Sequence, residues 1–263
     1  MKIPSQIRCY LWIAYPHFRL HFSLLLAGWL RQRYAARMLE VRDNNSPRIH
    51  PGDCLAVLKT LPDESIDLLL TDPPYGSSYL SRSKSLPLVR IAGDGANEAP
   101  KLTKKMLKIA WLKMKWNTHG YVFCDRWSYE ATKRAVIEAC FTLKNTLIWH
   151  KNNRTRGDLK GNYGYEDEWI LFFHKGRRWM FGKRDGNVLS FKKVPTQAMQ
   201  HPTEKPVELL EYLIQKSTLP GEVVLDPFMG IGSVCVAAKN TDRRYIGIEI
   251  ESVWYEVAKM RLG

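Results

Sequence analysis

The sequence predicts an α/β fold built on a doubly wound, mostly parallel sheet. Short apolar runs typical of buried strands alternate with stretches whose apolar residues recur at helical spacing, from about residue 55 to the end of the chain. Two of these runs are followed at once by loops rich in Pro or Gly, at residues 72–76 and 226–233. The chain has 263 residues, of which 45% are apolar and 25% charged, so it can bury a core of useful size.

The first half of the pattern begins after a polar loop at residues 44–47. It predicts, in order, a short helix at 55–58, a buried strand at 65–71, a loop-rich stretch at 76–100, a helix at 102–116, a strand at 121–124, a helix at 129–140, and strands at 146–150 and 168–173. A basic region rich in Gly and Asn lies between and after the last two strands and reaches residue 195.

The last third is the most regular part. Pro206 can occupy the first turn of a helix that continues over residues 207–216. A strand at 222–226, a turn at 227–233, a helix at 234–239, a strand at 244–249 and a closing helix from 253 follow.

Residues 1–37 do not fit this alternation. They hold six basic residues and no acidic one, and Pro16, His17, Arg19 and His21 interrupt their apolar stretch. A membrane-spanning helix needs about 20 mostly uncharged apolar residues, which this stretch does not supply, and a clear signal-peptide cleavage site is missing. The segment is either an amphipathic extension or a stretch upstream of a natural start at Met38. In both cases we expect it to lie outside the functional core.

Charge and cysteine content narrow the class of protein. Lys and Arg number 40 against 26 Asp and Glu, a formal charge of +14, which favours a polyanionic partner, nucleic acid first. A merely soluble basic protein would have the same composition. The five cysteines are scattered without a C-x-x-C pair, which excludes a disulfide scaffold and a zinc-finger framework and fits a reducing compartment. We predict no metal site.

Residues 226–233, Asp-Pro-Phe-Met-Gly-Ile-Gly-Ser, form a turn between a predicted strand and a predicted helix. Glycines there let the backbone bend tightly and approach a ligand closely. Glu249 follows 23 positions after Asp226, at the end of the next strand, where a carboxylate can accept hydrogen bonds from ribose hydroxyls. On its own this pattern is equally typical of a structural turn with Glu249 as a solvated strand end.

Residues 71–76, Thr-Asp-Pro-Pro-Tyr-Gly, follow the buried strand at 65–71. Two prolines cannot continue a ladder, so they predict a rigid loop at the carboxyl edge of the sheet, where open α/β sheets bind ligands. The loop presents one carboxylate, backbone carbonyls and one aromatic ring. Such acceptors suit an amino group that must lose a proton, and the ring of Tyr75 suits stacking on a flat heterocycle.

Together the two motifs resemble those of the amino-methylating DNA methyltransferases, the N6-adenine/N4-cytosine family that uses S-adenosyl-L-methionine. The catalytic motif precedes the cofactor motif, which looks like the permuted beta arrangement of that family. Gly52-Asp53-Cys54 resembles the family's adenine-contacting acidic site, and residues 201–206, His-Pro-Thr-Glu-Lys-Pro, resemble its motif near the methionine part of the cofactor. The resemblance covers residues 48–260. Ser233, where Thr is common, and Gly76, where Asn is frequent in one branch, are small departures.

The resemblance implies a Rossmann-like S-adenosylmethionine-dependent methyltransferase fold of roughly seven strands, formed by residues 38–263. It implies catalytic roles for Asp72, Pro73, Pro74 and Tyr75, with Asp72 and the Pro73 carbonyl accepting from the target amine. It implies a cofactor site made of Asp53, Lys205, Asp226, Phe228, Gly230, Gly232, Ser233 and Glu249. Within that site, Glu249 would hold the ribose and Asp53 would contact the adenine.

The resemblance indicates the identity of the methylated base less directly. In the family an Asp-first tetrad usually marks adenine and a Ser-first tetrad cytosine, so Asp72 favours the amino group of adenine, with N4 of cytosine as the alternative. A cytosine-carbon methyltransferase is disfavoured because its nucleophilic Cys usually follows Pro, and this chain has no Pro-Cys dipeptide. A DNA- or cofactor-binding pseudoenzyme would not need the intact tetrad. An RNA or protein substrate is a further alternative.

The basic region is the expected place of DNA contact. Residues 144–195 hold twelve Lys and Arg against five acidic residues, with aromatic side chains interleaved, among them Trp149, Tyr163, Tyr165, Trp169, Trp179 and Phe181. In the permuted family, target recognition lies between the catalytic and cofactor halves, so we expect residues 150–200 to be an inserted recognition region that binds double-stranded DNA. The target base would have to leave the duplex. We expect no membrane partner and a cytoplasmic location in a bacterium or its virus. Homodimer formation and a companion restriction enzyme stay open.

Overall fold

An eight-stranded sheet forms the centre of the part of the chain that the structure, a computed structural model, describes: residues 48–77, 92–152, 160–195, 197–201 and 203–263. The strands are β1 (Arg48–Pro51), β2 (Ile66–Thr71), β3 (Met114–Cys124), β4 (Thr142–His150), β5 (Asp167–Lys175), β6 (Val188–Ser190), β7 (Val223–Asp226) and β8 (Arg244–Glu249). Their order across the sheet is β1-β8-β7-β2-β3-β5-β4-β6. Only β5 runs against its neighbours β3 and β4, so the sheet is mostly parallel, as predicted.

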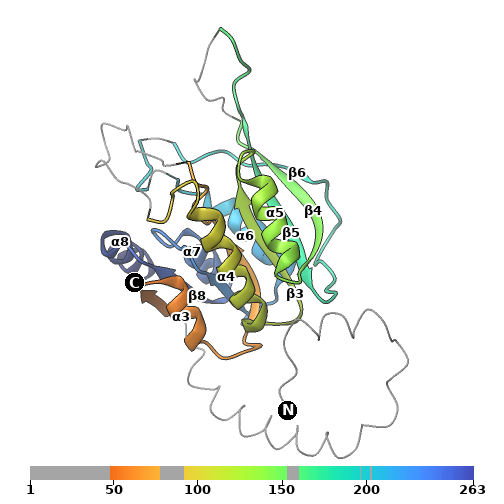
Figure 1. The fold of residues 1–263 in the computed structure, drawn as a ribbon, viewed down its shortest axis with the longest axis vertical. Coiled ribbons are helices and arrows are strands. Elements are labelled where there is room, and N and C mark those ends of the chain that lie inside the picture. Colours follow the sequence, from red (N-terminus) through yellow and green to blue (C-terminus); the bar gives the residue numbers. More distant parts are fainter. Residues whose placement is uncertain (1–47, 78–91, 153–159, 196, 202) are drawn as a thin grey trace, which may run out of the picture. The chain divides into compact units, whose positions relative to one another are not determined.

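Helices cover both faces of this sheet, which makes the fold doubly wound. They are α3 (Cys54–Thr60), α4 (Ala99–Lys113), α5 (Tyr129–Glu138), α6 (Val207–Ser217), α7 (Ser233–Asn240) and α8 (Ser252–Leu262). Figure 1 shows α3, α4 and α5 on the near face, with α6 and α7 behind the sheet. Successive side chains of β2 point to opposite faces of the sheet, so the strand contributes to both cores. Leu69 packs with α3, α4 and α5, whereas Leu68 and Leu70 pack with α6, α7 and α8.

The parallel strands β2, β3, β7 and β8 bring their carboxyl ends to one edge of the sheet. This edge is uppermost in Figure 1. The two sequence motifs follow β2 and β7, which are hydrogen-bonded neighbours, so the fold places both motifs side by side. This is the position at which open α/β sheets bind ligands.

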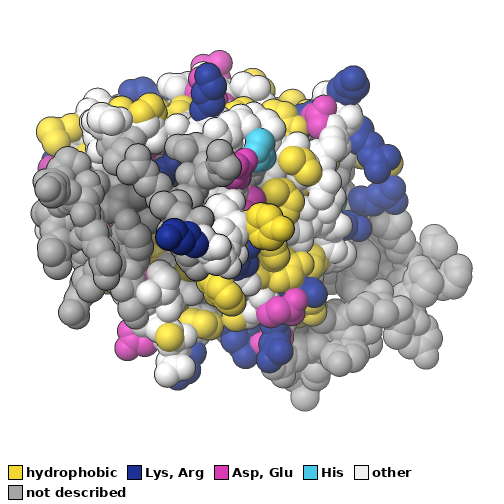
Figure 2. Space-filling model, turned by 90° about the horizontal axis from the view of Figure 1, so that it is seen from above, with side chains coloured by type: hydrophobic (Ala, Val, Ile, Leu, Met, Phe, Trp, Pro, Cys, Tyr) yellow, Lys and Arg dark blue, Asp and Glu magenta, His cyan; other side chains and the backbone are white. Residues whose placement is uncertain are grey.

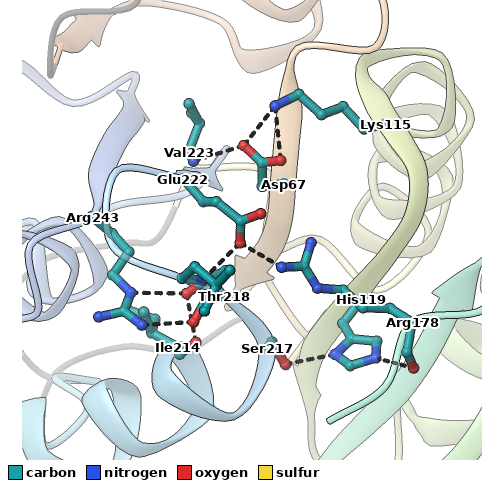
Figure 3. Close-up of polar contacts among 11 residues, drawn as sticks. Asp67, Lys115, His119, Arg178, Ile214, Ser217, Thr218, Glu222, Val223 and Arg243 are labelled. Carbon is teal, nitrogen blue, oxygen red and sulfur yellow. Dashed lines mark hydrogen bonds and ion pairs between the residues drawn. The ribbon is translucent and has the colours of Figure 1, made fainter. Parts of the chain in front are cut away.

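A network of hydrogen bonds and ion pairs joins the elements at the opposite edge of the sheet, where these parallel strands begin (Figure 3). Asp67, buried in β2, binds Lys115 Nζ at 2.8 and 2.9 Å and accepts a hydrogen bond from the Val223 backbone N–H at 2.9 Å. Arg178 binds Glu222 at 2.6 Å, and His119 lies 2.8 Å from the Ser217 hydroxyl. These contacts join β2, β3, β7 and the end of α6 far from the motif edge.

Several elements differ from the expectations drawn from the sequence. The sheet has eight strands among the described residues, where the resemblance implies roughly seven. Two of them, β1 and the three-residue β6, have no counterpart among the six strands that the sequence pattern predicts. Residues 114–116 begin β3 rather than ending the preceding helix, which runs from 99 to 113. Both errors have one cause: these strand segments are short, at an edge or partly exposed, so their apolar pattern is weak.

The expected recognition region is divided by the fold. Within residues 150–200, β5 and β6 belong to the central sheet, and the segments around them lie at two different edges of it. Because β5 is antiparallel to β3, residues 176–183 lie at the edge opposite the motifs, where Phe181 N–H donates to the Lys216 carbonyl at the end of α6. Of its described part, residues 151–152, 160–166, 191–195 and 197–200 lie at the motif edge.

The N-terminal segment 1–37 lies outside the described residues. None of the helices in the described part of the chain is long and apolar enough to cross a membrane.

Candidate active site

One cavity of about 680 Å³ opens at the carboxyl edge of the sheet. Its walls include both motifs, and its size falls in the range of small-molecule sites. Eleven of the twelve residues that the sequence assigns to catalysis or cofactor binding line it: Asp53, Asp72, Pro73, Pro74, Tyr75, Lys205, Asp226, Phe228, Gly230, Ser233 and Glu249. Gly232 does not. The fold therefore joins segments that lie more than 150 positions apart in the sequence.

The cavity is acidic although the protein is basic. Ten carboxylate residues line it (Asp53, Asp72, Asp94, Asp125, Asp167, Glu168, Glu204, Asp226, Glu249 and Glu251) against three basic ones (Arg126, Lys151 and Lys205). Low-dielectric walls lined by one sign of charge focus the field inside a cleft. The site therefore favours a cationic ligand.

The loop after β2 is held rigidly by its neighbours. Gly76 adopts φ +82°, a conformation that favours glycine, and its N–H donates to Asp94 Oδ1 at 2.7 Å. The Ser77 N–H and hydroxyl bind the same buried carboxylate. Asp94 was not identified from the sequence, because it comes 18 positions after the glycine that it binds. It fixes the end of the loop that presents Asp72 to Tyr75.

Asp72 lies at the centre of a polar cluster (Asp72, Tyr75, Lys151, Glu168 and Lys205), which we call the carboxylate–lysine cluster. The Lys205 ammonium binds Asp72 Oδ2 at 2.5 Å and Glu168 Oε1 at 2.9 Å. The Tyr75 hydroxyl lies 2.5 Å from Asp72 Oδ1 and 2.7 Å from Glu168 Oε1. Lys151 binds the other Glu168 oxygen at 2.9 Å. Four segments of the chain thus meet at two carboxylates.

Burial and charge act in opposite directions on these two carboxylates. Burial raises the pKa of Asp72, and the nearby Lys205 only partly offsets this. Burial alone would also raise the pKa of Glu168, but Lys205 and Lys151 outweigh it and lower the pKa to about 2. Glu168 is therefore the ionised partner, and Asp72 is the group that takes up a proton more readily.

Glu168 is the residue that sequence reasoning missed in this cluster. It lies in β5, and its side chain reaches the motif edge because β5 is inserted next to β3. A signal was present in hindsight, since two acidic residues begin a strand whose middle is a run of five apolar residues. Lys205, predicted as a cofactor ligand, lies on the catalytic side of the cavity, where its ammonium contacts Asp72 and Glu168.

The turn after β7 is held by two carboxylates. Asp226, buried at the end of β7, accepts hydrogen bonds from the Thr71 hydroxyl at 2.8 Å and the Phe228 N–H at 3.1 Å. Burial raises the pKa of Asp226 to about 7. Glu249 accepts from the Gly230 N–H at 2.9 Å and the Glu251 N–H at 2.8 Å. The Glu249 carboxylate still has a lone pair free for a ligand hydroxyl.

The two glycines of this turn have different surroundings. Gly230 lines the cavity with φ +52°, and a Cβ there would meet only His201 Nε2, at 4.0 Å. Gly232 has φ +78° and precedes α7, where a Cβ would lie 3.2 Å from the Ala258 Cβ of α8. Gly230 therefore leaves room in the cavity, whereas Gly232 allows α8 to pack closely.

Asp53, the predicted adenine ligand, lines the cavity from the start of α3. Asp53 caps α3, accepting from the Ala56 N–H at 2.8 Å, and the Gly52 N–H next to it donates to the Glu249 carbonyl at 2.8 Å. Asp53 and Glu249 thus stand on adjoining strand ends. Among the described residues, no group of three or more His, Cys, Asp or Glu side chains is arranged to hold a metal ion.

Comparison with known proteins identifies the family. The N6/N4 methyltransferase family, described as DNA methylase, matches residues 66–260, a span that includes both motifs. The chain belongs to this family. Methylase YubD of Escherichia coli (strain K12) is 34% identical over 82% of this chain and 90% of its own length. DNA adenine methyltransferase YhdJ of the same strain is 27% identical over 83% of each chain.

Solved structures agree with the fold of the methylase. The crystal structure of an M1.HpyAVI–SAM complex matches 82% of this chain and 99% of its own, with a TM-score of 0.65 and 26% identity. The cytosine-N4-specific PvuII DNA methyltransferase matches 83% of this chain and 86% of its own with a TM-score of 0.69. At 18% identity the second match bears on the fold alone. The doubly wound α/β prediction is confirmed.

Proposed function

We propose that this DNA methylase transfers a methyl group from S-adenosyl-L-methionine to the exocyclic N6 amino group of adenine in double-stranded DNA. One observation carries the proposal: a single cavity holds both the Asp72–Tyr75 loop and the Gly230 turn. A methyl donor bound at the turn and a flat base bound at the loop would meet within it. Placing two reactants together in this way removes much of the entropic barrier to their reaction.

The cavity fits the proposed cofactor by charge and by hydrogen-bonding groups. S-adenosyl-L-methionine supplies a methyl group on a positively charged sulfur, so no metal or covalent nucleophile is needed. The acidic lining suits that charge, and the M1.HpyAVI relative was solved with the same cofactor. Glu249 and Asp53, on adjoining strand ends, would accept from the ribose hydroxyls and the adenine amino group. Gly230 would let the backbone approach, and Phe228 would pack against the cofactor.

The target amino group would be bound by the loop after β2. Asp72 and the Pro73 carbonyl would accept its two hydrogens, which favours a pyramidal nitrogen with its lone pair available, and the Tyr75 ring would stack on the base. The nitrogen–methyl bond forms as the sulfur–methyl bond breaks and the sulfur keeps the electron pair. One amino proton must then leave, and the raised pKa of Asp72 equips this carboxylate to take it.

Adenine is favoured over cytosine by the Asp-first tetrad and by a relative named as a DNA adenine methyltransferase. N4 of cytosine is the second candidate, because the family that the chain belongs to includes N4 as well as N6 methyltransferases.

DNA would approach the carboxyl edge of the sheet. Seen from above, this face exposes hydrophobic side chains near its middle with Lys and Arg around them (Figure 2). Arg126 and Lys151 line the cavity there, and Trp127 is 81% exposed beside it. Basic groups would bind phosphates and aromatic groups would meet bases. The basic residues at 175–184, which lie at the other edge, would not reach the target base.

Identification of the methylated nucleoside tests the proposal. DNA incubated with the protein and methyl-labelled cofactor is digested to nucleosides, and mass spectrometry locates the label. The expected labelled product is N6-methyldeoxyadenosine. N4-methyldeoxycytidine would select the second candidate, and label on neither base with several DNA sequences would contradict a DNA-modifying function.

A further inference from the structure

Lys205 lies between two carboxylates from separate parts of the chain. Its side chain is 8% exposed, and its ammonium binds Asp72 at 2.5 Å and Glu168 at 2.9 Å. The side chain of Glu168 is 11% exposed. Long charged side chains are seldom buried to this degree unless they are paired. The position of Lys205 therefore needs an explanation that involves Asp72.

We propose that Glu168 and Lys205 are positioning residues that set the place and the charge of Asp72 for methyl transfer. The proposal rests on the proposed function, since it assigns roles around the same carboxylate. It departs from the cofactor role that the sequence resemblance implies for Lys205. It also adds Glu168, which no motif includes.

Hydrogen-bond accounting supports the positioning role. The Tyr75 hydroxyl lies within hydrogen-bond distance of both Asp72 and Glu168, but its single proton can be donated to only one of them. Lys205, with three protons, donates to both carboxylates and holds them together around the hydroxyl. Both Asp72 oxygens are thus held from within the protein, and each has a lone pair left for the target amine.

Charge supports the second half of the proposal. Lys205 stabilises the ionised form of Asp72, whereas the negative charge of Glu168 opposes it. The Lys205 ammonium also binds Glu168, so its charge is shared between the two carboxylates and is not paired with Asp72 alone. Asp72 is therefore left able to accept from the substrate rather than being neutralised by one lysine.

The titratable and charged groups around Asp72 come from every neighbouring segment: Tyr75 on its own loop, Cys124 at the end of β3, Lys151 after β4, Glu168 in β5, Lys193 after β6, Lys205 before α6, and Asp226 at the end of β7. Of these, Lys205, Tyr75 and Glu168 are the groups whose effect on the Asp72 pKa is resolved. Lys205 lowers it first through its charge and then through a hydrogen bond, Glu168 raises it through charge, and Tyr75 lowers it through a hydrogen bond.

The test is the pH dependence of kcat in two single variants. Lys205→Met removes the cation beside Asp72, so the acid limb of the kcat profile should move to higher pH, by about one pH unit or more. Glu168→Gln removes the anion beside Asp72, so the limb should move to lower pH. A merely structural role would not move the two limbs in opposite directions. Both variants should lower kcat by about tenfold or more at pH 7, a typical cost of lost positioning.

Cofactor affinity separates this role from the one that the resemblance implies. Calorimetric titration with S-adenosyl-L-methionine should give nearly the wild-type Kd for Lys205→Met, and a measurable Kd also shows that the variant is folded. Lys205→Gln serves the same purpose if the methionine variant does not fold. Glu166→Gln is the matched control: it makes the same chemical change two residues before Glu168, at a side chain that pairs with His150, and should not move the limb.

The outcomes are distinguishable. Wild-type protein that methylates no DNA would overturn the proposed function itself. Active wild-type protein together with unmoved limbs, or with limbs that move in the same direction, would overturn the positioning roles alone. Loss of cofactor binding in both Lys205 variants would return Lys205 to the cofactor site.

Discussion

At the scale of single residues, Asp72 is where the site's chemistry concentrates. Asp72→Asn keeps the size of the side chain and one acceptor oxygen, but replaces the other with an amide donor that faces Lys205 and the target amine. Loss of one preorganised group of this kind typically costs about 3 kcal/mol, or about a hundredfold in rate. We expect kcat to fall by that factor while the Kd values for cofactor and DNA change little, because Glu249 and the Gly230 turn would hold the cofactor.

Single-turnover methylation and calorimetric titration measure these quantities for the Asp72 variant. Asp63→Asn is a suitable control, since Asp63 pairs with Lys113 at the other edge of the sheet and is 57% exposed. A variant that methylates at the wild-type rate would rule out Asp72 as an acceptor for the amine. A variant that no longer binds cofactor would place Asp72 in the cofactor site.

We expect substitutions at the two glycines of the turn after β7 to affect different properties, cofactor binding at Gly230 and stability at Gly232. Gly230→Val places a branched side chain at φ +52° on the cavity wall, so we expect weaker cofactor binding in a folded protein. Gly232→Val strains a φ of +78° and drives side-chain atoms into α8, so we expect a lower Tm. Thermal unfolding without cofactor and calorimetric titration separate the two effects. Equal loss of stability in both variants would contradict the assignment of Gly230 to the ligand side.

The residues of the site show what the sequence can predict. Asp72 to Tyr75, Gly230 and Glu249 lie in local motifs with a recognisable spacing, so the sequence predicts them. Glu168 and Asp94 carry no motif, because their roles arise only when β5 pairs with β3 and when the loop after residue 91 returns to Gly76. Likewise, the contacts of Lys205 depend on Glu168, so a sequence pattern alone does not reveal its neighbours.

At the scale of elements, the turn between β3 and α5 is where we expect contact with DNA. β3 is the parallel neighbour of β2, so residues 125–128 lie beside the Asp72 loop. Asp125 accepts hydrogen bonds from the N–H groups of Trp127 and Ser128, which fixes the turn. Trp127 extends from it with 81% of its surface exposed. An exposed aromatic side chain on a rigid turn can fill the space that an extruded base leaves.

We therefore expect Trp127→Ala to slow methylation of a fully paired duplex. The loss should be smaller on a duplex in which the target base faces an abasic site, because that base leaves the stack at lower cost. Steady-state rates on the two substrates measure the difference. Trp179→Ala is the control, since Trp179 is 75% exposed but lies after β5 at the opposite edge. Equal losses on both substrates would show that Trp127 takes no part in base extrusion.

Elements also differ in how well their sequence predicts them. β2, β7, β8 and the helices beside them were predicted within a few residues, because each is buried on both faces or shows a clear helical stripe. β1 and β6 were missed because each lies at an edge of the sheet and contributes few buried residues. An edge strand depends on its partner rather than on its own apolar pattern, so the local sequence says little about it.

At the scale of the whole molecule, the fold separates two kinds of polar chemistry. The carboxyl edge collects acidic groups around a cavity, whereas the amino edge uses its charges to join elements (Figure 3). The net positive charge of the chain would draw DNA towards the molecule, and the acidic cavity would then accept a cationic methyl donor. The order of the motifs along the chain matters little to this division, because parallel pairing brings their ends to the same edge.

Buried histidines at the amino edge predict how the stability of the molecule depends on pH. Burial lowers the pKa of His119 and of His174 to about 4, from an ordinary value of 6.5. Between these pH values the unfolded chain binds protons that the folded chain does not, so the free energy of unfolding should fall as the pH falls from about 6.5 to about 4. Asp226 acts in the opposite sense, since its raised pKa of about 7 lets the folded state take up a proton in the same range.

His174→Phe isolates the histidine contribution. Neither ring nitrogen of His174 has a hydrogen-bond partner among the described residues, and the ring packs against Phe172 and His119. A phenyl ring removes an unsatisfied buried polar group, worth about 1–3 kcal/mol, and the proton that the unfolded chain would bind. Thermal unfolding from pH 7 to pH 5 should therefore show a higher Tm and a smaller decline in Tm than in the wild type. His150→Gln, at an exposed position paired with Glu166, should retain the wild-type decline. A His174→Phe profile parallel to the wild type would mean that this histidine does not contribute to the acid-side loss of stability.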